Sequence, residues 1–283
     1  MKKKLLLIVL LTLFVLCGCV NQTPAETTSP KETQPQTYPT ETAVETTYPE
    51  MLECATAEGF VTRESIDNNT PCHIRIAKQR GDHALTGDFS YVLYVEIDTG
   101  TAVLKKELES KVSPFPEVSL FLGDVDGDGI QEIFIHDNTG GCGGFGLWRT
   151  WILKVEDNEI GILFQNYNEF DTGFESRFLD GYQLEVKNRL TGYCLVFDVK
   201  KGHRNYIDDC KELPDGNIDL DPFYVFEPED TDDDGISEVV CKQYTSIISH
   251  VDYTGTACSV LKFNTETLAF EVVNAWYEPY IEK

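Results

Sequence analysis

The sequence predicts an all-β protein that arose by tandem duplication of a unit of about 100 residues. Apolar and β-branched residues come in short runs, and Gly, Asp and Asn separate these runs. Windows of a dozen residues lack the 3.6-residue period of an amphipathic helix, and only the polar segment 105–111 could form a short one. The third observation is an acidic loop that occurs twice, at residues 124–132 and 230–238.

Residues 1–18 have the organisation of a signal peptide. Three lysines precede the apolar stretch 5–16, which is too short to span a membrane. The stretch ends in Leu16-Cys17-Gly18-Cys19, which resembles the bacterial lipobox. This resemblance implies cleavage before Cys19, a lipid on Cys19, and a chain anchored at the extracellular face of the cell membrane. The alternative is an ordinary secretion signal followed by chance cysteines.

Residues 19–50 are predicted to form a disordered stalk. Thr, Pro and Glu dominate the segment, so it has too little apolar surface to offset the entropy lost on ordering. The remaining residues, 51–283, are numerous enough for a β-rich ectodomain with a core of its own. The formal net charge of −25 argues against a nucleic-acid partner and favours cation binding.

Within the ectodomain the order hairpin, acidic loop with strand, hairpin occurs twice. The two halves extend over about residues 85–175 and 185–283. The first hairpins begin at 91–100 and 193–202, and the last hairpins match in pattern. The segment 51–84 lies outside the repeat, and we expect it to complete a sheet or to cap an edge.

Each acidic loop contains the groups that a calcium ion needs. Asp at positions 1, 3 and 5 brings three carboxylates together, Gly at position 6 permits a sharp bend, and position 7 offers its carbonyl. An EF-hand would end with Glu at position 12, whereas both loops carry Glu at position 9 and continue directly into a strand. The sequence therefore excludes a helix–loop–helix sensor and predicts a calcium-binding loop that connects two strands. The alternative is a solvated acidic turn that binds no ion.

The pattern D-x-D-x-D-G-x-x-[DE] followed by a strand resembles the calcium loops of FG-GAP and VCBS-type (integrin-like) β-propeller repeats. The Ca²⁺ ligands that this resemblance implies are Asp124, Asp126, Asp128, the Ile130 carbonyl and Glu132, and Asp230, Asp232, Asp234, the Ile236 carbonyl and Glu238. The Gly-Ala-Pro element of those families is absent, and the two loops lie about 106 residues apart. We therefore expect a small or incomplete β-propeller-like assembly instead of a full ring.

The cysteines of the ectodomain allow two interpretations. Neighbouring cysteines could form disulfides in an exported protein, or they could stay reduced in a strand-rich core. The simplest pairs are Cys54–Cys72, Cys194–Cys210 and Cys241–Cys258, which leave Cys142 over.

The Gly-rich segment 136–148 is the one place with possible catalytic chemistry. It places Cys142 near His136 and Asp137, but it matches no local signature of a cysteine enzyme. We interpret it as a structural loop, and the alternatives are chemistry at Cys142 or a ligand contact in which Trp148 and Trp151 stack on a sugar. The acidic segment 215–221 lacks the Gly at position 6, so we interpret it as a turn.

Three classes of function follow. The first is a lipid-anchored extracellular module, stiffened by calcium, that binds a surface protein or a glycan through the segments 136–148 and 243–257. The second is an extracellular hydrolase or transferase that uses the segment 136–148. The third is a structural envelope lipoprotein. No catalytic residue and no cofactor besides calcium is predicted.

Overall fold

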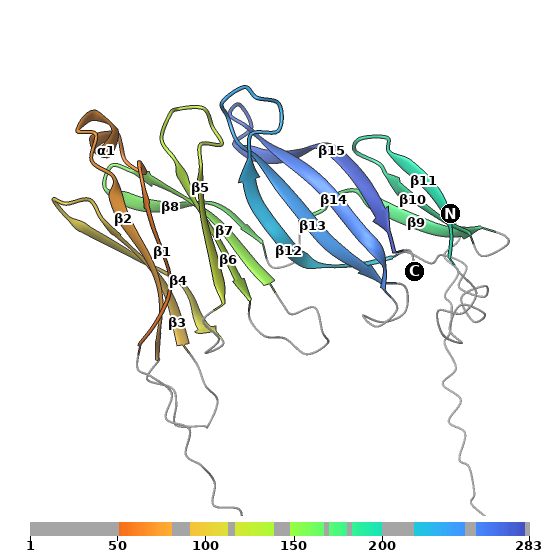
Figure 1. Cartoon of the computed structure of the whole chain (residues 1–283), viewed down its shortest axis with the longest axis horizontal. Helices are drawn as coiled ribbons and strands as arrows, with labels where there is room; N and C mark the ends of the chain where they lie inside the picture. The colour runs from red at the N-terminus through yellow and green to blue at the C-terminus, as the bar shows by residue number, and fades with distance from the viewer. Residues whose placement is uncertain are drawn as a thin grey trace, which may run out of the picture. The chain divides into compact units, whose positions relative to one another are not determined.

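The computed structural model describes residues 51–80, 91–112, 117–138, 148–166, 170–179, 183–199, 218–246 and 253–280 (Figure 1). In these residues the fold is all-β, as predicted, with one short helix, α1 (Arg63–Asp67). The predicted signal peptide, Cys19, the stalk, Cys142 and Cys210 lie outside the described residues. No helix in the described part of the chain is long and apolar enough to cross a membrane.

The strands form four antiparallel sheets, in each of which consecutive strands are neighbours. Sheet A contains β1 (Met51–Gly59), β2 (Cys72–Arg80), β3 (Tyr91–Asp98) and β4 (Val103–Val112). Sheet B contains β5 (Val118–Gly123), β6 (Glu132–Asn138), β7 (Trp148–Glu156) and β8 (Glu159–Asn166). Sheet C contains β9 (Phe174–Leu179), β10 (Gln183–Asn188) and β11 (Cys194–Asp198). Sheet D contains β12 (Asp219–Glu229), β13 (Glu238–Ser246), β14 (Tyr253–Asn264) and β15 (Ala269–Pro279).

Local sequence explains most of these strands. In β3 the side chains alternate between buried and partly buried positions, which is the period of a strand with one face on a core. The turn between β7 and β8 consists of Asp157 and Asn158, which have positive φ of 50° and 61°. Two residues with positive φ give the type I′ turn that matches the twist of a hairpin.

The prediction of a short helix over 105–111 was wrong, because these residues belong to β4. The strand pairs with the apolar β3 along its length, and Leu108 between the charged residues is buried in the core. Pairing with a distant strand therefore overrides the local propensity of a polar segment. The segment 51–84 supplies β1 and β2. Strand β1 pairs with β2, and β2 pairs in turn with β3.

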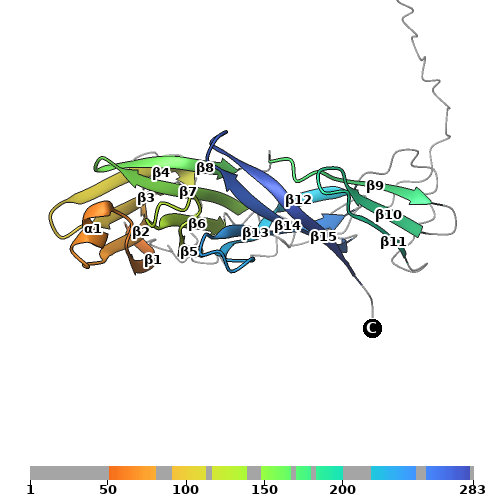
Figure 2. The same ribbon diagram turned by 90° about the horizontal axis from the view of Figure 1, so that it is seen from above.

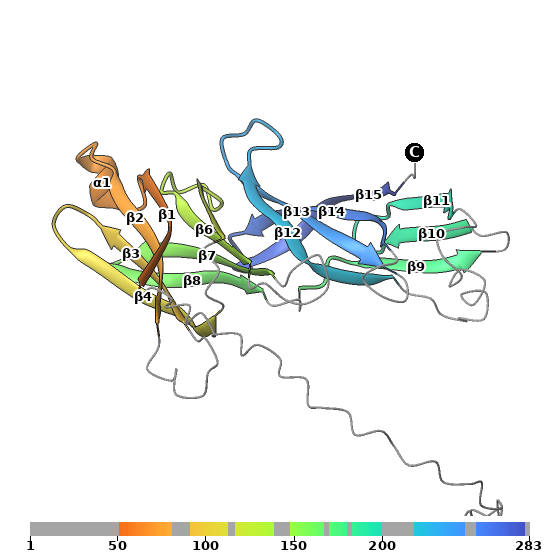
Figure 3. The same ribbon diagram turned by 60° about the horizontal axis from the view of Figure 1, so that its bottom comes forward.

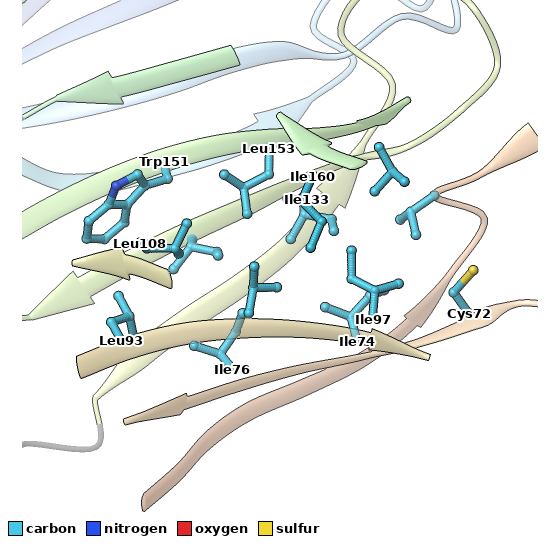
Figure 4. Close-up of a cluster of buried hydrophobic side chains, with 14 of the residues drawn as sticks. Cys72, Ile74, Ile76, Leu93, Ile97, Leu108, Ile133, Trp151, Leu153 and Ile160 are labelled. Atoms are coloured by element: carbon cyan, nitrogen blue, oxygen red, sulfur yellow. The ribbon is translucent and has the colours of Figure 1, made fainter. Parts of the chain in front are cut away.

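Within the described residues, three apolar cores hold the sheets together. The first lies between sheets A and B, where Ile74, Ile97 and Leu93 meet Ile133 and Trp151 (Figure 4). The second joins sheets B and D, and the third joins sheets C and D. The sheets therefore pack in the order A, B, D, C, although C precedes D in the chain (Figures 1 and 2).

The described cysteines have free thiols, so the pairs Cys54–Cys72 and Cys241–Cys258 are not formed. Cys258 lies opposite Lys242 in the register, so Cys241 points to the other face of sheet D. Cys72 lies opposite Gly59, several residues along β1 from Cys54. Alternation and register thus keep both pairs beyond the reach of a disulfide.

Candidate metal centres

The two acidic loops occupy equivalent places in sheets B and D. Loop 1 (residues 124–132) joins β5 to β6 (Figure 1), and loop 2 (residues 230–238) joins β12 to β13 (Figure 3). Each loop thus connects the first two strands of its sheet. The position-6 glycines, Gly129 and Gly235, have φ of 81° and 87°. These values lie in the left-handed region that glycine enters without strain, which is the sharp bend predicted from the sequence.

In loop 1 each acidic side chain accepts hydrogen bonds from backbone N–H groups of the loop. Asp124 accepts hydrogen bonds from the N–H groups of Gly127 and Gly129, both at 2.8 Å. Asp126 Oδ1 accepts from Asp128 N at 3.2 Å. Asp128 Oδ1 accepts from Ile130 N at 2.7 Å, and Glu132 Oε2 accepts from Val125 N at 2.9 Å. The loop is thus folded around its own acids.

Loop 2 repeats this arrangement. Asp230 accepts from the N–H groups of Asp234 and Gly235, at 3.0 and 2.9 Å. Asp232 Oδ1 accepts from Asp234 N at 3.2 Å, and Asp234 Oδ1 accepts from Ile236 N at 2.8 Å. Glu238 Oε2 accepts from the N–H and the hydroxyl of Thr231. Ile130 and Ile236, whose carbonyls are predicted ligands, therefore also fix their loops through their N–H groups.

The remaining carboxylate oxygens of both loops converge on a lysine. In loop 1, Lys154 Nζ from β7 contacts Asp126 Oδ2, lies 3.0 Å from Asp128 Oδ2 and lies 3.9 Å from Glu132 Oε1. In loop 2, Lys262 Nζ from β14 lies 3.3 Å from Asp232 Oδ2, 3.1 Å from Asp234 Oδ2 and 2.8 Å from Glu238 Oε1. Each cluster of acids thus surrounds one ammonium group.

The geometry brings most of the predicted ligands together. Asp124, Asp126 and Glu132 can offer oxygens within 4.8 Å of one another, as can Asp230, Asp232 and Asp234. Asp128 and Glu238 join these groups through the shared lysine. Several carboxylate oxygens around one point form the kind of donor set that a hard cation such as Ca²⁺ prefers.

The position-9 glutamates have opposite pKa shifts. Burial raises the pKa of Glu132 to about 8, although the hydrogen bond from Val125 N opposes this effect. Burial acts on Glu238 in the same direction, but the adjacent Lys262 ammonium group and the hydrogen bonds from Thr231 outweigh it, and its pKa lies below the ordinary value. Burial acts to lower the pKa of Lys154, but hydrogen bonds to Asp126 and Asp128 outweigh it, so the net shift is upward.

The two loops also touch each other. Ser237 N in loop 2 donates to the Asp124 carbonyl in loop 1 at 2.7 Å. A Cβ atom on Gly127 would lie 2.8 Å from Cδ1 of Ile236, so loop 1 packs directly against loop 2. The helix α1 contacts loop 1 through Arg63, whose Nη2 donates to the Asp128 carbonyl at 3.0 Å.

Sequence reasoning missed the two lysines and Arg63. Lys154 and Lys262 follow a leucine at matching places of the last hairpins, Leu153-Lys154 and Leu261-Lys262, which was the available signal. Their role depends on neighbouring strands of one sheet, because β7 and β14 each pair with the strand that follows the loop.

The structure separates the candidate catalytic residues. His136 and Asp137 are adjacent in β6, so their side chains point to opposite faces of the sheet. His136 Nε2 lies 2.7 Å from the Phe223 carbonyl in sheet D, while Asp137 Oδ1 accepts from Lys78 Nζ in sheet A at 2.5 Å. Burial lowers the pKa of His136 to about 4. The two residues therefore do not form a His–Asp pair, and residues 139–147 lie outside the described residues.

Two further expectations about ligand contacts need correction. Trp151 is fully buried in the core between sheets A and B, so it cannot stack on a sugar. The segment 243–257 is not a long loop, because its ends belong to β13 and β14. Both errors have the same cause, since Trp151 and the two ends of the segment 243–257 lie in paired strands.

The fold and the paired loops define an all-β protein with two acidic inter-strand sites. Part of its chain is similar in sequence to known proteins. The family described as the YybI C-terminal domain matches residues 172–278, the region of sheets C and D. The chain is 24% identical over 161 residues to a protein described as "Uncharacterized protein YybI" from Bacillus subtilis (strain 168). The alignment covers 54% of this chain and 60% of that protein, so the chain spans less than two thirds of the relative's length. No solved structure matches the chain.

Proposed function

We propose that the protein is a lipid-anchored extracellular module in which Ca²⁺ ions at loops 1 and 2 stiffen a propeller-like array of sheets that binds a glycan or a surface protein. One observation carries the calcium sites. In both loops, the aspartates at the third and fifth positions of the motif each accept a hydrogen bond from a backbone N–H with one carboxylate oxygen. Their other oxygens point at one position, where a lysine ammonium group lies. The four-stranded meanders of sheets B and D are blade-like and support the propeller-like arrangement.

Calcium binding is tested by calorimetry on the purified full chain. We expect binding with a dissociation constant of about 10⁻⁴–10⁻³ M, the range of extracellular modules. Asp126→Ala and Asp232→Ala should each remove one site, because each deletes an oxygen that faces the centre of its loop. Glu266→Ala, in the exposed turn between β14 and β15, is the matched control and should bind as the parent does. Identical titrations for all four proteins would refute the calcium sites.

The ligand-binding surface is proposed on sheet D. A groove of about 560 Å³ lies beside loop 2 and includes Lys242, Asn274 and Trp276 in its lining. Near it, Tyr224 and Tyr244 stack with ring centroids 3.8 Å apart. An indole beside amide and charged groups suits a sugar ring, whose apolar face stacks on an aromatic side chain while its hydroxyls form hydrogen bonds.

Binding to a panel of soluble glycans by affinity electrophoresis tests this surface. Trp276→Ala should weaken retention of any bound glycan by about tenfold or more, which corresponds to the loss of one stacking contact and its hydrogen bonds. Leu268→Ala, at an exposed position of the β14–β15 turn, should leave retention unchanged. Equal retention of both variants would place the binding surface elsewhere.

Anchoring rests on the lipobox-like sequence that ends at Cys19. Replacement Cys19→Ser should move the protein from the membrane fraction of the producing cells to the soluble fraction. An unchanged distribution would show that the protein is not held by a lipid on this cysteine.

A further inference from the structure

We propose that Lys154 and Lys262 are built-in counter-cations which a calcium ion must displace, so that these two lysines set the calcium affinity of loops 1 and 2. This inference rests on the proposed calcium sites and concerns what regulates them. It assigns control of the calcium affinity to residues that are not ligands.

The position of each ammonium group is the first argument. Lys262 Nζ lies between 2.8 and 3.3 Å from one oxygen of Asp232, Asp234 and Glu238. A calcium ion needs such oxygens at about 2.3–2.6 Å, so it would take the place of the ammonium group. The two cations cannot share the site, both because they overlap and because like charges repel at this distance.

Glu132 supplies an independent argument at loop 1. Its side chain is fully buried, and among the described residues its Oε1 has no hydrogen-bond donor. An ammonium group has three donors, and Asp126, Asp128 and Glu156 all lie nearer to Lys154 Nζ than Glu132 does. The lysine therefore leaves one buried oxygen unsatisfied. A calcium ion, which takes about six to eight oxygens, would use it.

A displaced lysine has another partner in each case. The exposed Glu156 already lies 3.4 Å from Lys154 Nζ, just outside loop 1. Glu271 lies directly opposite Lys262 in the register of β14 and β15. Because the lysine side chain is long and flexible, each ammonium group can turn to such a carboxylate when calcium enters.

The structure also explains why lysines are needed there. Without any cation, the three carboxylates that surround each lysine would repel one another across a few ångströms. The lysines neutralise part of this charge and keep the loops folded when calcium is scarce. They lower the affinity for calcium in return.

The test is calcium calorimetry on the full chain at low ionic strength, with thermal melts in EDTA and in excess calcium. Lys154→Met and Lys262→Met keep the length of the side chain and remove its charge. Each should lower the dissociation constant of its loop at least about tenfold. Each should also melt below the parent in EDTA and gain more from calcium than the parent gains. The control is Lys105→Met, which removes an ion pair with Glu96 in sheet A and should leave calcium binding unchanged.

The outcomes separate this inference from the proposed function. Calcium binding by the parent with unchanged affinity in both methionine variants would overturn the inference and leave the calcium sites intact. Loss of binding in the variants, repeated with Lys154→Gln and Lys262→Gln, would show that the lysines organise the loops, which also overturns it. If the parent and all variants bind no calcium, the proposed function fails first. Binding by the variants alone would support the inference most strongly.

Discussion

Loops 1 and 2 have the same motif and closely similar internal hydrogen bonds, but they lie at different depths. In loop 1 the side chains of Asp126 and Lys154 are 12% and 14% exposed. The equivalent Asp232 and Lys262 are 54% and 36% exposed. Loop 1 packs between helix α1 and loop 2, which accounts for its lower exposure. Solvent therefore screens the Asp126–Lys154 pair less than the Asp232–Lys262 pair.

The strands that follow the loops also differ, in the polar contacts that they make. Asp137 in β6 and Gln243 in β13 are equivalent by the repeat, and both are buried. Asp137 forms an ion pair with the buried Lys78, whereas Gln243 donates to the Asp221 carbonyl at 2.8 Å and accepts from Thr172 at 3.0 Å. Sheet B thus joins its neighbour through charges at a position where sheet D uses a neutral amide.

The largest predicted effect is that of breaking the buried ion pair. Lys78→Met should lower the free energy of unfolding by about 3–5 kcal/mol, because it leaves Asp137 buried without its counter-charge. Gln243→Met should lower it by about 1–3 kcal/mol, the cost of leaving neutral hydrogen-bonding groups unpaired. Urea denaturation of both variants measures the difference.

Two further variants control this comparison. The double substitution Lys78→Met with Asp137→Leu should recover much of the loss, because it removes both charges. Lys105→Met, in a partly exposed ion pair, should change the free energy of unfolding by about 1 kcal/mol or less. Similar losses for Lys78→Met and Lys105→Met would show that burial does not distinguish the two pairs.

Acid should weaken the protein through His136. Its pKa is about 4 in the folded protein because it is buried, whereas the ordinary value is 6.5. Between these values the unfolded chain binds the proton and the folded chain does not, so stability is fully present above about pH 6.5 and falls as the pH drops towards 4. The full loss is about 3 kcal/mol from the pKa difference.

The matched variant is His136→Gln, whose amide can still donate to the Phe223 carbonyl and does not titrate. Urea denaturation at about pH 7 and about pH 4.5 should show a smaller acid loss for this variant than for the parent. Substitution of the exposed His73, which lies 3.4 Å from Glu58, should leave the acid loss as it is. Equal pH dependence of the parent and His136→Gln would contradict the assignment.

The parts of the fold that depend on neighbouring residues could be predicted from the sequence. Alternation located most strands, and the early Glu with its strand flanks placed both acidic loops between strands. Gly129 and Gly235 were predicted at sharp bends, which their positive φ values confirm. These features are local, because a turn or an alternating strand is determined within about ten residues.

The parts that depend on distant residues were missed. Strand β4 has a polar sequence and owes its conformation to β3. Lys154 and Lys262 reach the loops from a neighbouring strand, and the packing order A, B, D, C joins sheets that are not consecutive in the chain. Such contacts leave no periodic signal in one sequence. Burial of Trp151 and the ion pair of Lys78 belong to the same class.

The smallest predicted effects concern the third residue after the first Asp of each loop, which is Gly127 in loop 1 and Asp233 in loop 2. Both have positive φ, 75° and 60°. Gly127→Ala should lower the free energy of unfolding by about 1–2 kcal/mol, because alanine is strained at this φ and its Cβ would press on Ile236. Asp233→Gly should change the free energy of unfolding by less than about 0.5 kcal/mol, because Asp tolerates this conformation. Glycine would relieve the small remaining strain, but it would also make the unfolded chain more flexible, and the two effects offset each other.

Hydrogen exchange at Ser237 N–H shows whether the destabilisation caused by Gly127→Ala stays in loop 1 or extends to loop 2. That group donates to the Asp124 carbonyl, and the neighbouring Ile236 is the residue that a side chain at position 127 would displace. Gly127→Ala should therefore accelerate exchange in loop 2, although the substitution lies in loop 1, while Asp233→Gly should not. Unchanged exchange in both variants would mean that the loops fold independently. Acceleration only in Gly127→Ala would mean that the more buried loop 1 stabilises the more exposed loop 2. The two loops would then form one structural unit in spite of their different exposure.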